Sequence, residues 1–398
     1  MKIAKGKAPA GRELPPAGGE ETTEAFPSRR ERGKEAMIKQ AIAKVVKGLD
    51  LPENEMAAAM DEVFSGMATP SQIGALMAAL RIKGETVDEI TAAARTMRAR
   101  AVKIRVNNGF VNLDRDEINV EEETILDTCG TGGDGTNTFN ISTATAFVAA
   151  GGGVRVAKHG NRAVSSRCGS ADVLSNLGVR LDLNQSNIEQ CIREIGIGFL
   201  YAPLFHGAMK HVAGPRQEVG IRSLFNLLGP LTNPASATTQ VLGVYDPHLT
   251  EIMAGALGRL GTRQAFVVCG EETLDEISLC GPTRMTHLKE GEIRTSRVEP
   301  EDFGFERAPS ESIRGGTARE NAQLIRRVLS GEKGARRDVV ILNAAAAFVA
   351  ADVEPDFVSG AQRARDAIDS GSARRKLDGL IEFTQDCRPF VRGEIAAA

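Results

Sequence analysis

Two short segments of this chain hold residues whose types and spacing suggest chemistry. The first is the glycine loop Asp127-Thr-Cys-Gly-Thr-Gly-Gly-Asp134, which stands between an apolar, strand-like run and a helix start. The second is the cationic turn Lys158-His-Gly-Asn161, which follows the next apolar run. Backbone N–H groups of a glycine loop and the positive end of a helix attract phosphate, and nearby cations strengthen that attraction. The two segments together predict a site for a phosphorylated substrate.

The glycine loop formally matches a dinucleotide-binding fingerprint, but its context argues against one. Residues 130–135 fit the pattern G-x-G-x-x-G. A dinucleotide site needs an acidic residue at the end of the second strand to bind a ribose hydroxyl. This chain has Lys158 and His159 there, and no Gly-Lys-Ser/Thr follows the loop as in a Walker motif. Both kinds of nucleotide site are therefore excluded.

Polar residues extend both segments. Asn140, Ser142 and Thr143 follow the glycine loop and precede an alanine-rich helix, and each could simply cap that helix. Three such side chains beside a glycine loop exceed the needs of one cap, so we expect them to hold phosphate. The cationic turn continues through serines and arginines to Ser170, which could cap a helix starting near Ala171. We interpret this stretch as an anion-binding loop rather than a solvated basic turn.

Adjacent carboxylates later in the chain are candidates for a metal site. Asp275-Glu276 and Glu271-Glu272 lie close together after an apolar run. A substrate with several phosphates needs Mg²⁺, which binds one or two carboxylates together with substrate oxygens and water. Local chemistry does not separate the two acidic pairs, and exposed carboxylates without a ligand remain the alternative for both.

The composition restricts the class of protein. Of 398 residues, 42% are hydrophobic and 25% charged, as in ordinary globular proteins. A net charge of −3 argues against broad, non-specific binding to nucleic acid. The six cysteines are dispersed and form no C-x-x-C pair, which argues against zinc and redox motifs and favours a reducing compartment. Since the apolar runs are too short for a bilayer and no secretion signal is recognisable, we expect a cytoplasmic protein.

The pattern of elements predicts an α/β fold with a small helical N-terminal domain. Residues 1–36 are rich in Pro, Gly and charge, which predicts a disordered extension. Helical spacing follows, with capping boxes at Thr69-Pro-Ser-Gln72 and Thr86-Val-Asp-Glu89. From about residue 122, short apolar runs alternate with glycine turns and helices, as in a mainly parallel sheet flanked by helices.

The same pattern predicts strands and domain boundaries. The runs interpreted as buried strands are residues 124–128, 153–157, 264–269 and 338–343. Helical spacing between about residues 185 and 215 suggests that these helices return to the N-terminal bundle. The predicted division is therefore a helical domain of residues 37–119 plus about 185–215, and an α/β domain of residues 120–184 and 216–398.

These motifs resemble those of the anthranilate phosphoribosyltransferase family. The resemblance covers roughly residues 37–390 and rests on Gly130-Thr-Gly-Gly-Asp134, Asn140-Ile-Ser-Thr143 and Lys158-His-Gly-Asn161. Two later motifs add to it: Ser223-Leu-Phe-Asn-Leu-Leu-Gly-Pro-Leu-Thr-Asn-Pro234 and Leu274-Asp-Glu-Ile-Ser278. The resemblance implies a homodimer formed through the helical domains and an active site between the two domains. It also implies transfer of phosphoribose from phosphoribosyl pyrophosphate to the amine of anthranilate, a step of tryptophan biosynthesis.

The resemblance also implies residue roles. Together with the anion-binding loops, it predicts a phosphoribosyl pyrophosphate site of Gly130, Gly133, Asp134, Thr138, Asn140, Ile141, Ser142, Thr143, Lys158, His159, Gly160, Asn161, Ser165, Ser166 and Ser170. By resemblance, Mg²⁺ would be held by Ser142, Asp275 and Glu276, and anthranilate by Gly130, Asn161 and Arg216. A planar guanidinium suits a benzoate carboxylate. The sequence departs from the family pattern just before this arginine. Family members often carry proline after the histidine that corresponds to His206. This chain has Gly207 there and, later, Gly214-Pro215.

No residue is predicted to act as a catalytic acid or base. The aromatic amine of anthranilate is neutral at pH 7, so its attack on the ribose depends on positioning and on stabilisation of the leaving pyrophosphate. Two alternatives remain. A pyrimidine nucleoside phosphorylase shares the architecture but should not need the Asp275-Glu276 pair. A nucleic-acid-binding relative without transferase activity would need a broad basic surface, which the net charge of −3 does not favour.

Overall fold

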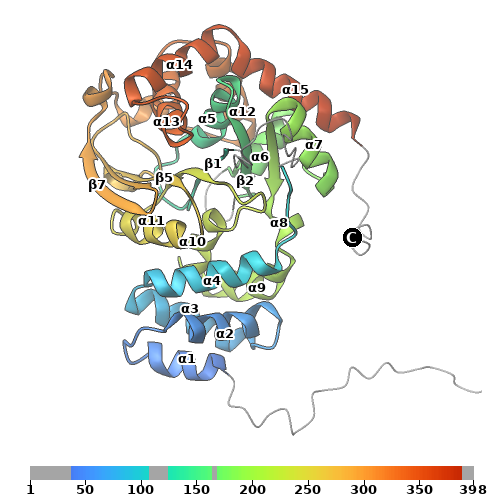
Figure 1. Cartoon of the computed structure of the whole chain (residues 1–398), viewed down its shortest axis with the longest axis vertical. Helices are drawn as coiled ribbons and strands as arrows, with labels where there is room; N and C mark the ends of the chain where they lie inside the picture. Colours follow the sequence, from blue (N-terminus) through green and yellow to red (C-terminus); the bar gives the residue numbers. More distant parts are fainter. Residues whose placement is uncertain (1–36, 107–123, 164–167, 388–398) are drawn as a thin grey trace, which may run out of the picture. The chain divides into compact units, whose positions relative to one another are not determined.

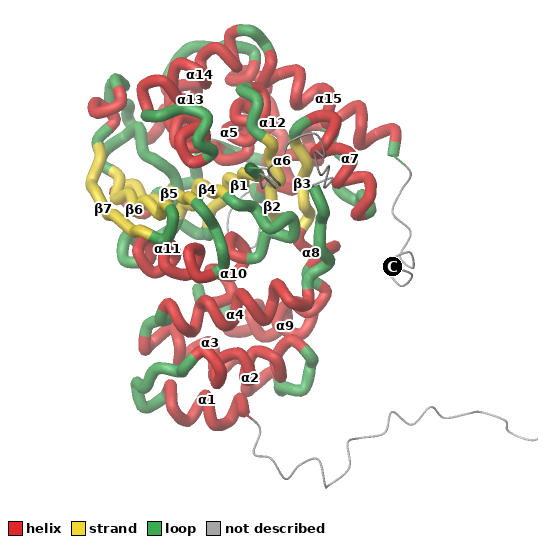
Figure 2. The backbone as a smooth tube through the Cα atoms, viewed as in Figure 1, coloured by secondary structure: helices red, strands yellow, loops and turns green. Residues whose placement is uncertain are grey.

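The computed structural model describes residues 37–106, 124–163 and 168–387 (Figure 1). The predicted disorder of residues 1–36 lies outside this part of the chain, as do Ser165 and Ser166 of the predicted site. The described residues form a helical part and a sheet with helices on both of its faces (Figure 2). This arrangement confirms the predicted α/β fold class.

The helical part begins with α1 (Met37–Val45), α2 (Glu53–Phe64), α3 (Pro70–Lys83) and α4 (Val87–Arg100). Helix α1 packs against α2 and α3, and α2 packs against α4. Both predicted capping boxes are confirmed, because the Thr69 hydroxyl accepts from the Gln72 N–H while the Gln72 side chain accepts from the Thr69 N–H. Thr86 and Glu89 form the same reciprocal pair at the start of α4.

The sheet has the strand order β3-β2-β1-β4-β5-β6-β7. Its strands are β1 (Ile125–Gly130), β2 (Arg155–Gly160), β3 (Ile197–Tyr201), β4 (Thr239–Gly243), β5 (Gln264–Gly270), β6 (Thr283–Lys289) and β7 (Glu292–Val298). Strands β1 to β5 run parallel to one another, and β6 pairs antiparallel with both of its neighbours, β5 and β7. Parallel strands end at one common edge, so the glycine loop after β1 and the cationic turn at the end of β2 lie beside each other there. Strands β1, β2 and β5 confirm three of the four predicted strands.

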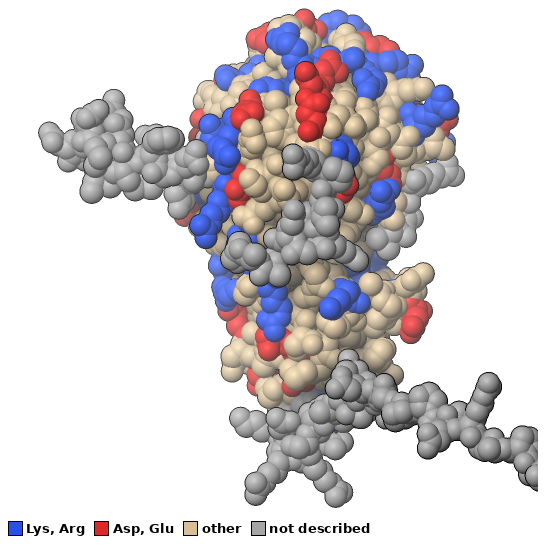
Figure 3. All heavy atoms as spheres, turned by 90° about the vertical axis from the view of Figure 1, so that its right-hand side faces the viewer, with Lys and Arg blue, Asp and Glu red and all other residues tan. Residues whose placement is uncertain are grey.

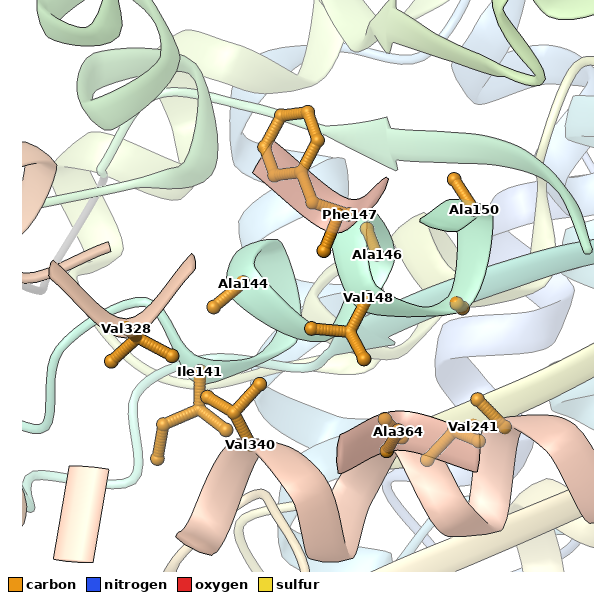
Figure 4. Close-up of a cluster of buried hydrophobic side chains, with 14 of the residues drawn as sticks. Ile141, Ala144, Ala146, Phe147, Val148, Ala150, Val241, Val328, Val340 and Ala364 are labelled. Carbon is orange, nitrogen blue, oxygen red and sulfur yellow. The ribbon is translucent and has the colours of Figure 1, made fainter. Parts of the chain in front are cut away.

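The remaining helices cover the sheet or connect its strands. They are α5 (Ile141–Gly151), α6 (Ser170–Leu177), α7 (Gln185–Ile195), α8 (Ala202–Phe205), α9 (Lys210–Val219), α10 (Leu224–Leu231), α11 (Leu249–Arg259), α12 (Ala318–Leu329), α13 (Ala335–Ala350), α14 (Phe357–Asp369) and α15 (Ser372–Asp386). Short 3-10 turns occupy Gly207–Met209, Glu271–Thr273, Pro300–Phe303 and Ser310–Ile313. Helix α5 is central to the core: Figure 4 shows its Ile141 and Val148 on the side facing Val340 of α13.

The fourth predicted strand, residues 338–343, is wrong because these residues lie inside α13. Almost every residue from Arg337 to Phe348 is buried, so the run shows no polar face and its spacing does not distinguish a buried strand from a buried helix. The alanines at 344–347 favour continuation of a helix. The six-residue window was therefore too short to identify the element.

The segment from residue 185 to residue 219 divides between the two parts. Helix α7 packs against β3, β2 and α15, and β3 is a strand of the sheet, so residues 185–201 do not return to the helical bundle. Helix α9 instead packs against α3 and α2. We therefore propose that the helical domain comprises residues 37–106 with residues 202–219, in place of the predicted 37–119 with about 185–215.

Asn343 of α13 should be important for stability. Its side chain is fully buried, accepts from the Ile277 N–H and donates to the carbonyls of Ile277 and Val339. Replacing Asn343 by alanine leaves the Ile277 backbone groups without these partners, and we expect a loss of about 2–4 kcal/mol in the free energy of unfolding. Urea denaturation measures it. The exposed Gln362→Ala, on α14, should change the value by less than about 0.5 kcal/mol.

Candidate active site

Glycines at the strand ends let the acidic segment approach the glycine loop. Gly130 ends β1, Gly243 ends β4, and the two are paired in the sheet. A side chain on Gly130 would overlap the Asp275 carboxylate, and one on Gly243 would overlap the Asp275 backbone. Thr273 secures the approach, because its hydroxyl donates to the Asp134 carbonyl over 2.7 Å. The fold therefore brings together two motifs far apart in sequence.

The two carboxylates bind the backbone donors that the sequence assigns to phosphate. The Gly132 N–H donates to Asp275 Oδ2 over 2.9 Å, and the Ser142 N–H donates to Glu276 Oε1 over 2.9 Å. Ser142 lies in the first turn of α5, where helical N–H groups have no partner within the helix. Both contacts show that these N–H groups are placed to bind negatively charged oxygens.

Lys158 supplies a buried positive charge next to this pair. Its side chain is 3% exposed and donates to the Thr128 carbonyl and to the Ser142 hydroxyl, the latter over 3.3 Å. Ser142 therefore contacts Glu276 through its N–H and Lys158 through its hydroxyl. The predicted cationic turn, glycine loop and acidic pair meet at the start of α5.

Asp127 is a site residue that sequence reasoning did not identify. It is fully buried, accepts from the His159 N–H over 3.2 Å and accepts from Asn233 Nδ2 over 2.8 Å. Burial raises its pKa to about 6, while the charge of Lys158 acts in the opposite direction. Asp127 and Asn233 both stand in motifs quoted above, but nothing in the sequence showed that they meet. The pair holds the cationic turn against β1.

Burial raises the pKa of both acidic residues. The pKa of Asp275 rises to about 7, first through burial and then through the neighbouring charge of Asp134. The pKa of Glu276 also rises, through burial and then through Asp275, while Lys158 and the Ser142 N–H act against the rise. A bound cation would relieve this repulsion. Carboxylate and hydroxyl oxygens are the ligands that Mg²⁺ prefers, so Asp275, Glu276 and Ser142 fit this metal.

The acidic groups do not form a complete metal cage by themselves. Within the described ranges, no three His, Cys, Asp or Glu side chains gather as a metal-binding group. This arrangement suits a cation held jointly by one or two carboxylates and by substrate oxygens. The competing acidic pair differs, because Glu271 is exposed and forms an ion pair with Arg297.

The second anion-binding stretch is built around Gly160 and Ser170. A side chain on Gly160 would overlap the Ser170 hydroxyl, so the two lie in contact. Ser170 is the first residue of α6 and Gly169 occupies the capping position, which corrects the expectation that Ser170 caps this helix. Asp172 accepts from the Gly169 N–H over 3.0 Å and fixes this helix start.

The polar residues after the glycine loop are not helix caps either. Asn140 stands at the capping position of α5 without a side-chain cap bond. Its amide instead donates to the Cys168 carbonyl over 3.2 Å and accepts from Asn321 over 3.0 Å, so it ties α5 to the second stretch. Thr138 forms an isolated bridge with Arg314, and the buried Thr143 hydroxyl has no partner among the described residues.

Arg216 lies in the last turn of α9 and is half-buried, which lowers its pKa. No described residue accepts a hydrogen bond from its side chain or forms an ion pair with it. Pro215 is accommodated inside α9, and Gly220 ends the helix with φ +67°. The structure thus places Arg216 on the helical part, and its predicted contact with an acceptor stays a prediction.

Two buried histidines lie beside each other, His159 near the end of β2 and His206 directly after α8. The rings of His159 and His206 are 5.1 Å apart, and burial lowers their pKa values to about 4 and about 3. His159 Nδ1 lies 3.1 Å from the Gly229 carbonyl oxygen, so this nitrogen donates and carries the ring proton. His159 therefore adds no positive charge at neutral pH. Lys158 is the cation of this turn.

The pH dependence of stability should reveal the buried acid Asp275. Its pKa, about 7 in the folded chain, lies above the ordinary 3.8, so its stabilising contribution is complete below pH 3.8 and disappears as the pH rises through 7. The histidines act oppositely, losing stability below pH 6.5. We therefore expect Asp275→Asn to gain stability relative to wild type between pH 5 and pH 8 in metal-free buffer. Urea denaturation of both proteins tests this prediction. A difference in the free energy of unfolding that stays constant from pH 5 to pH 8 would refute it.

Comparisons with known proteins agree with this architecture. The model described as a glycosyl transferase family helical bundle domain matches residues 39–101, and the model of that family's a/b domain matches residues 122–374. The anthranilate phosphoribosyltransferase of Geobacter sulfurreducens is 57% identical over 350 residues, covering 88% of this chain and 100% of that protein.

Solved structures agree as well. The enzyme of that name from Thermus thermophilus has a TM-score of 0.79 and 44% identity, covering 87% of this chain and 99% of its own. The Saccharomyces cerevisiae enzyme in complex with PRPP and Mg has a TM-score of 0.78 and 28% identity, covering 89% of this chain and 99% of its own. The fold and the site thus define a glycosyltransferase with a helical bundle domain and an α/β domain. More narrowly, the chain belongs to the anthranilate phosphoribosyltransferase family.

Proposed function

We propose that this protein transfers the phosphoribosyl group of phosphoribosyl pyrophosphate to the amine of anthranilate, releasing N-(5-phosphoribosyl)anthranilate and pyrophosphate. The observation that supports this best is the meeting of Asp275 and Glu276 with the glycine loop, the start of α5 and Lys158. Relatives that carry this activity in their names cover nearly the whole described chain. We propose that phosphoribosyl pyrophosphate binds to the glycine-loop and cationic-turn residues that the sequence predicts for it.

The residues of the chain act mainly through charge and position. Bound Mg²⁺ would supply charge neutralisation of the leaving pyrophosphate. Lys158 adds a fixed positive charge, and the N–H groups of the glycine loop and of α5 provide preorganised donors. Arg216 would hold the anthranilate carboxylate, leaving the neutral amine free to attack C1′ of the ribose. No residue needs to remove a proton before attack.

We further propose that the protein is cytoplasmic and forms a homodimer through its helical part. Large apolar side chains are exposed there, among them Ile82 at 87%, Val46 at 70% and Met67 at 66%. A contiguous patch of such side chains would favour a surface that is covered in an assembly. Sedimentation should show a dimer that Ile82→Lys weakens. In the part of the chain that the structure describes, no helix has the length and apolar character to cross a membrane.

A fluorescence assay tests the proposed function. Anthranilate fluorescence should decrease when phosphoribosyl pyrophosphate and Mg²⁺ are both present, and not when either is omitted. An unchanged signal at saturating substrates would refute the function. Release of a free base from pyrimidine nucleoside and phosphate would instead indicate a phosphorylase. On the face shown in Figure 3, basic and acidic side chains are interspersed among the described residues, which does not support the nucleic-acid alternative for that face.

Arg216→Ala should mainly raise the KM for anthranilate. Loss of a charge-assisted contact to a carboxylate costs about 1.5–3 kcal/mol, or roughly 10–100-fold. The KM for phosphoribosyl pyrophosphate should change little. Steady-state kinetics with Gln217→Ala, the exposed neighbour on α9, gives the matched control. An anthranilate KM equal to wild type would refute the assigned role.

A further inference from the structure

Arg222 lies next to the glycine loop and has no partner of opposite charge among the residues that the structure describes. It lies on the short connection between α9 and α10. Its guanidinium stacks on the Tyr245 ring, with Cζ 4.5 Å from the ring centroid. A side chain on Gly133 would lie 3.2 Å from Arg222 Nε. The guanidinium is therefore held against the backbone of the glycine loop.

The position of Arg222 follows from rigid elements on both sides. Tyr245 follows the end of β4, is 2% exposed and donates its N–H to the Thr131 hydroxyl over 3.3 Å. The phenol ring is thus fixed to the glycine loop and offers a flat apolar surface to the guanidinium. On the other side, Ser223 is the buried residue that precedes α10, and its N–H donates to Oδ1 of Asn226 over 3.1 Å. These contacts position the arginine without using its hydrogen-bond donors.

The donors of Arg222 remain available. No described residue accepts a hydrogen bond from its side chain or forms an ion pair with it. Other arginines of the described chain form ion pairs, for example Arg284 with Glu251 and Arg307 with Glu299 and Glu301. A guanidinium presents a planar fork of N–H groups that matches phosphate oxygens. A stacked, exposed arginine beside a phosphate-binding loop is therefore placed to bind an anion.

We propose that Arg222 is a further substrate-binding residue, which binds the pyrophosphate group of phosphoribosyl pyrophosphate over the glycine loop. This inference rests on the proposed function. Lys158 lies on the sheet side of the loop, and Arg222 comes from the connection that follows α9. The leaving group would thus be contacted by cations from two different elements, which adds to the stabilisation of its developing charge.

The same connection would join the donor and acceptor sites. Arg216 stands in the last turn of α9, and Gly220 ends that helix in the left-handed conformation, just before Arg222. An arginine for the acceptor and an arginine for the leaving group therefore belong to one helix end. Binding of pyrophosphate by Arg222 would help to fix α9, and with it Arg216, in position for the acceptor.

Binding of inorganic pyrophosphate tests the proposal directly. Isothermal titration calorimetry with MgCl₂ and pyrophosphate should show a Kd about 10–100-fold higher for Arg222→Ala than for wild type. Arg222→Lys, which keeps the charge but not the fork, should lie between the two. Tyr245→Phe keeps the stacking ring and should bind like wild type, whereas Tyr245→Leu should weaken binding. Arg294→Ala, an exposed arginine on β7, is the matched control and should change nothing.

The kinetics separate this role from a structural one. Arg222→Ala should raise the KM for phosphoribosyl pyrophosphate and lower kcat at an unchanged melting temperature, with a smaller effect on the anthranilate KM. A pyrophosphate Kd within twofold of wild type in folded Arg222→Ala would overturn the proposal and leave the proposed function intact. Absence of pyrophosphate binding in the wild type would overturn both. Pyrophosphate binding that depends on Arg222, without transfer to anthranilate, would support the role of Arg222 and refute only the proposal that anthranilate is the acceptor.

Discussion

Replacing Glu276 by glutamine should lower kcat/KM for the magnesium-dependent transfer by about 10²–10³-fold, the cost of losing one well-placed group that stabilises transition-state charge. Glutamine keeps the shape and an oxygen that accepts from the Ser142 N–H, so the substitution removes only the negative charge. The pKa of Glu276 is raised by burial and by Asp275, so the neutral residue relieves repulsion in the metal-free protein. The melting temperature should therefore stay constant or rise while activity falls.

The matched control for Glu276 is Glu271→Gln. Glu271 belongs to the acidic pair that local sequence did not exclude, but it is exposed and paired with Arg297. Its replacement should change kcat/KM by less than about twofold, as expected for a surface ion pair. Raising the Mg²⁺ concentration should partly restore Glu276→Gln, because the variant binds the metal more weakly. Equal activity of both variants would contradict the metal site at Asp275 and Glu276.

Much of this site was predictable because its residues stand at strand ends. The strands before Gly130 and after Gly153 were recognised from short apolar runs, and parallel strands bring their carboxyl ends to one edge. The prediction that the glycine loop and Lys158 are neighbours therefore needed only local pattern and topology. The structure places Lys158 beside Ser142, at 3.3 Å, as this argument requires.

Other parts of the site depend on contacts that local sequence does not encode. Asp127 meets Asn233 across more than a hundred residues, and both looked like ordinary members of a strand and a turn. Arg222 stacks on Tyr245 only because α9 and β4 end near each other. His159 stands beside Lys158 in the predicted site, and its burial against Gly229 keeps the ring neutral. Burial and long-range pairing thus decide which polar residues are charged.

Lys158→Met should separate the two roles of the buried lysine. Loss of its charge from the pyrophosphate site should lower kcat by about 10²–10³-fold. Its loss also leaves the fully buried Asp127 without its main counter-charge, which costs about 3–5 kcal/mol of stability when the carboxyl is ionised. The pKa of Asp127 is about 6, and removal of the lysine raises it further, so the cost in stability should be large at pH 8 and small at pH 5.

The double variant Asp127→Asn/Lys158→Met then distinguishes charge balance from catalysis. Neutralising both partners removes the uncompensated buried charge, so part of the stability lost in Lys158→Met should return at pH 8. The recovery should be incomplete, because the amide of Asn at position 127 must face either the His159 N–H or Asn233 Nδ2, and both are donors. Activity should remain as low as in Lys158→Met. Urea denaturation at both pH values and single-turnover kinetics measure the two effects, and recovery of activity in the double variant would show that Lys158 serves only to neutralise Asp127.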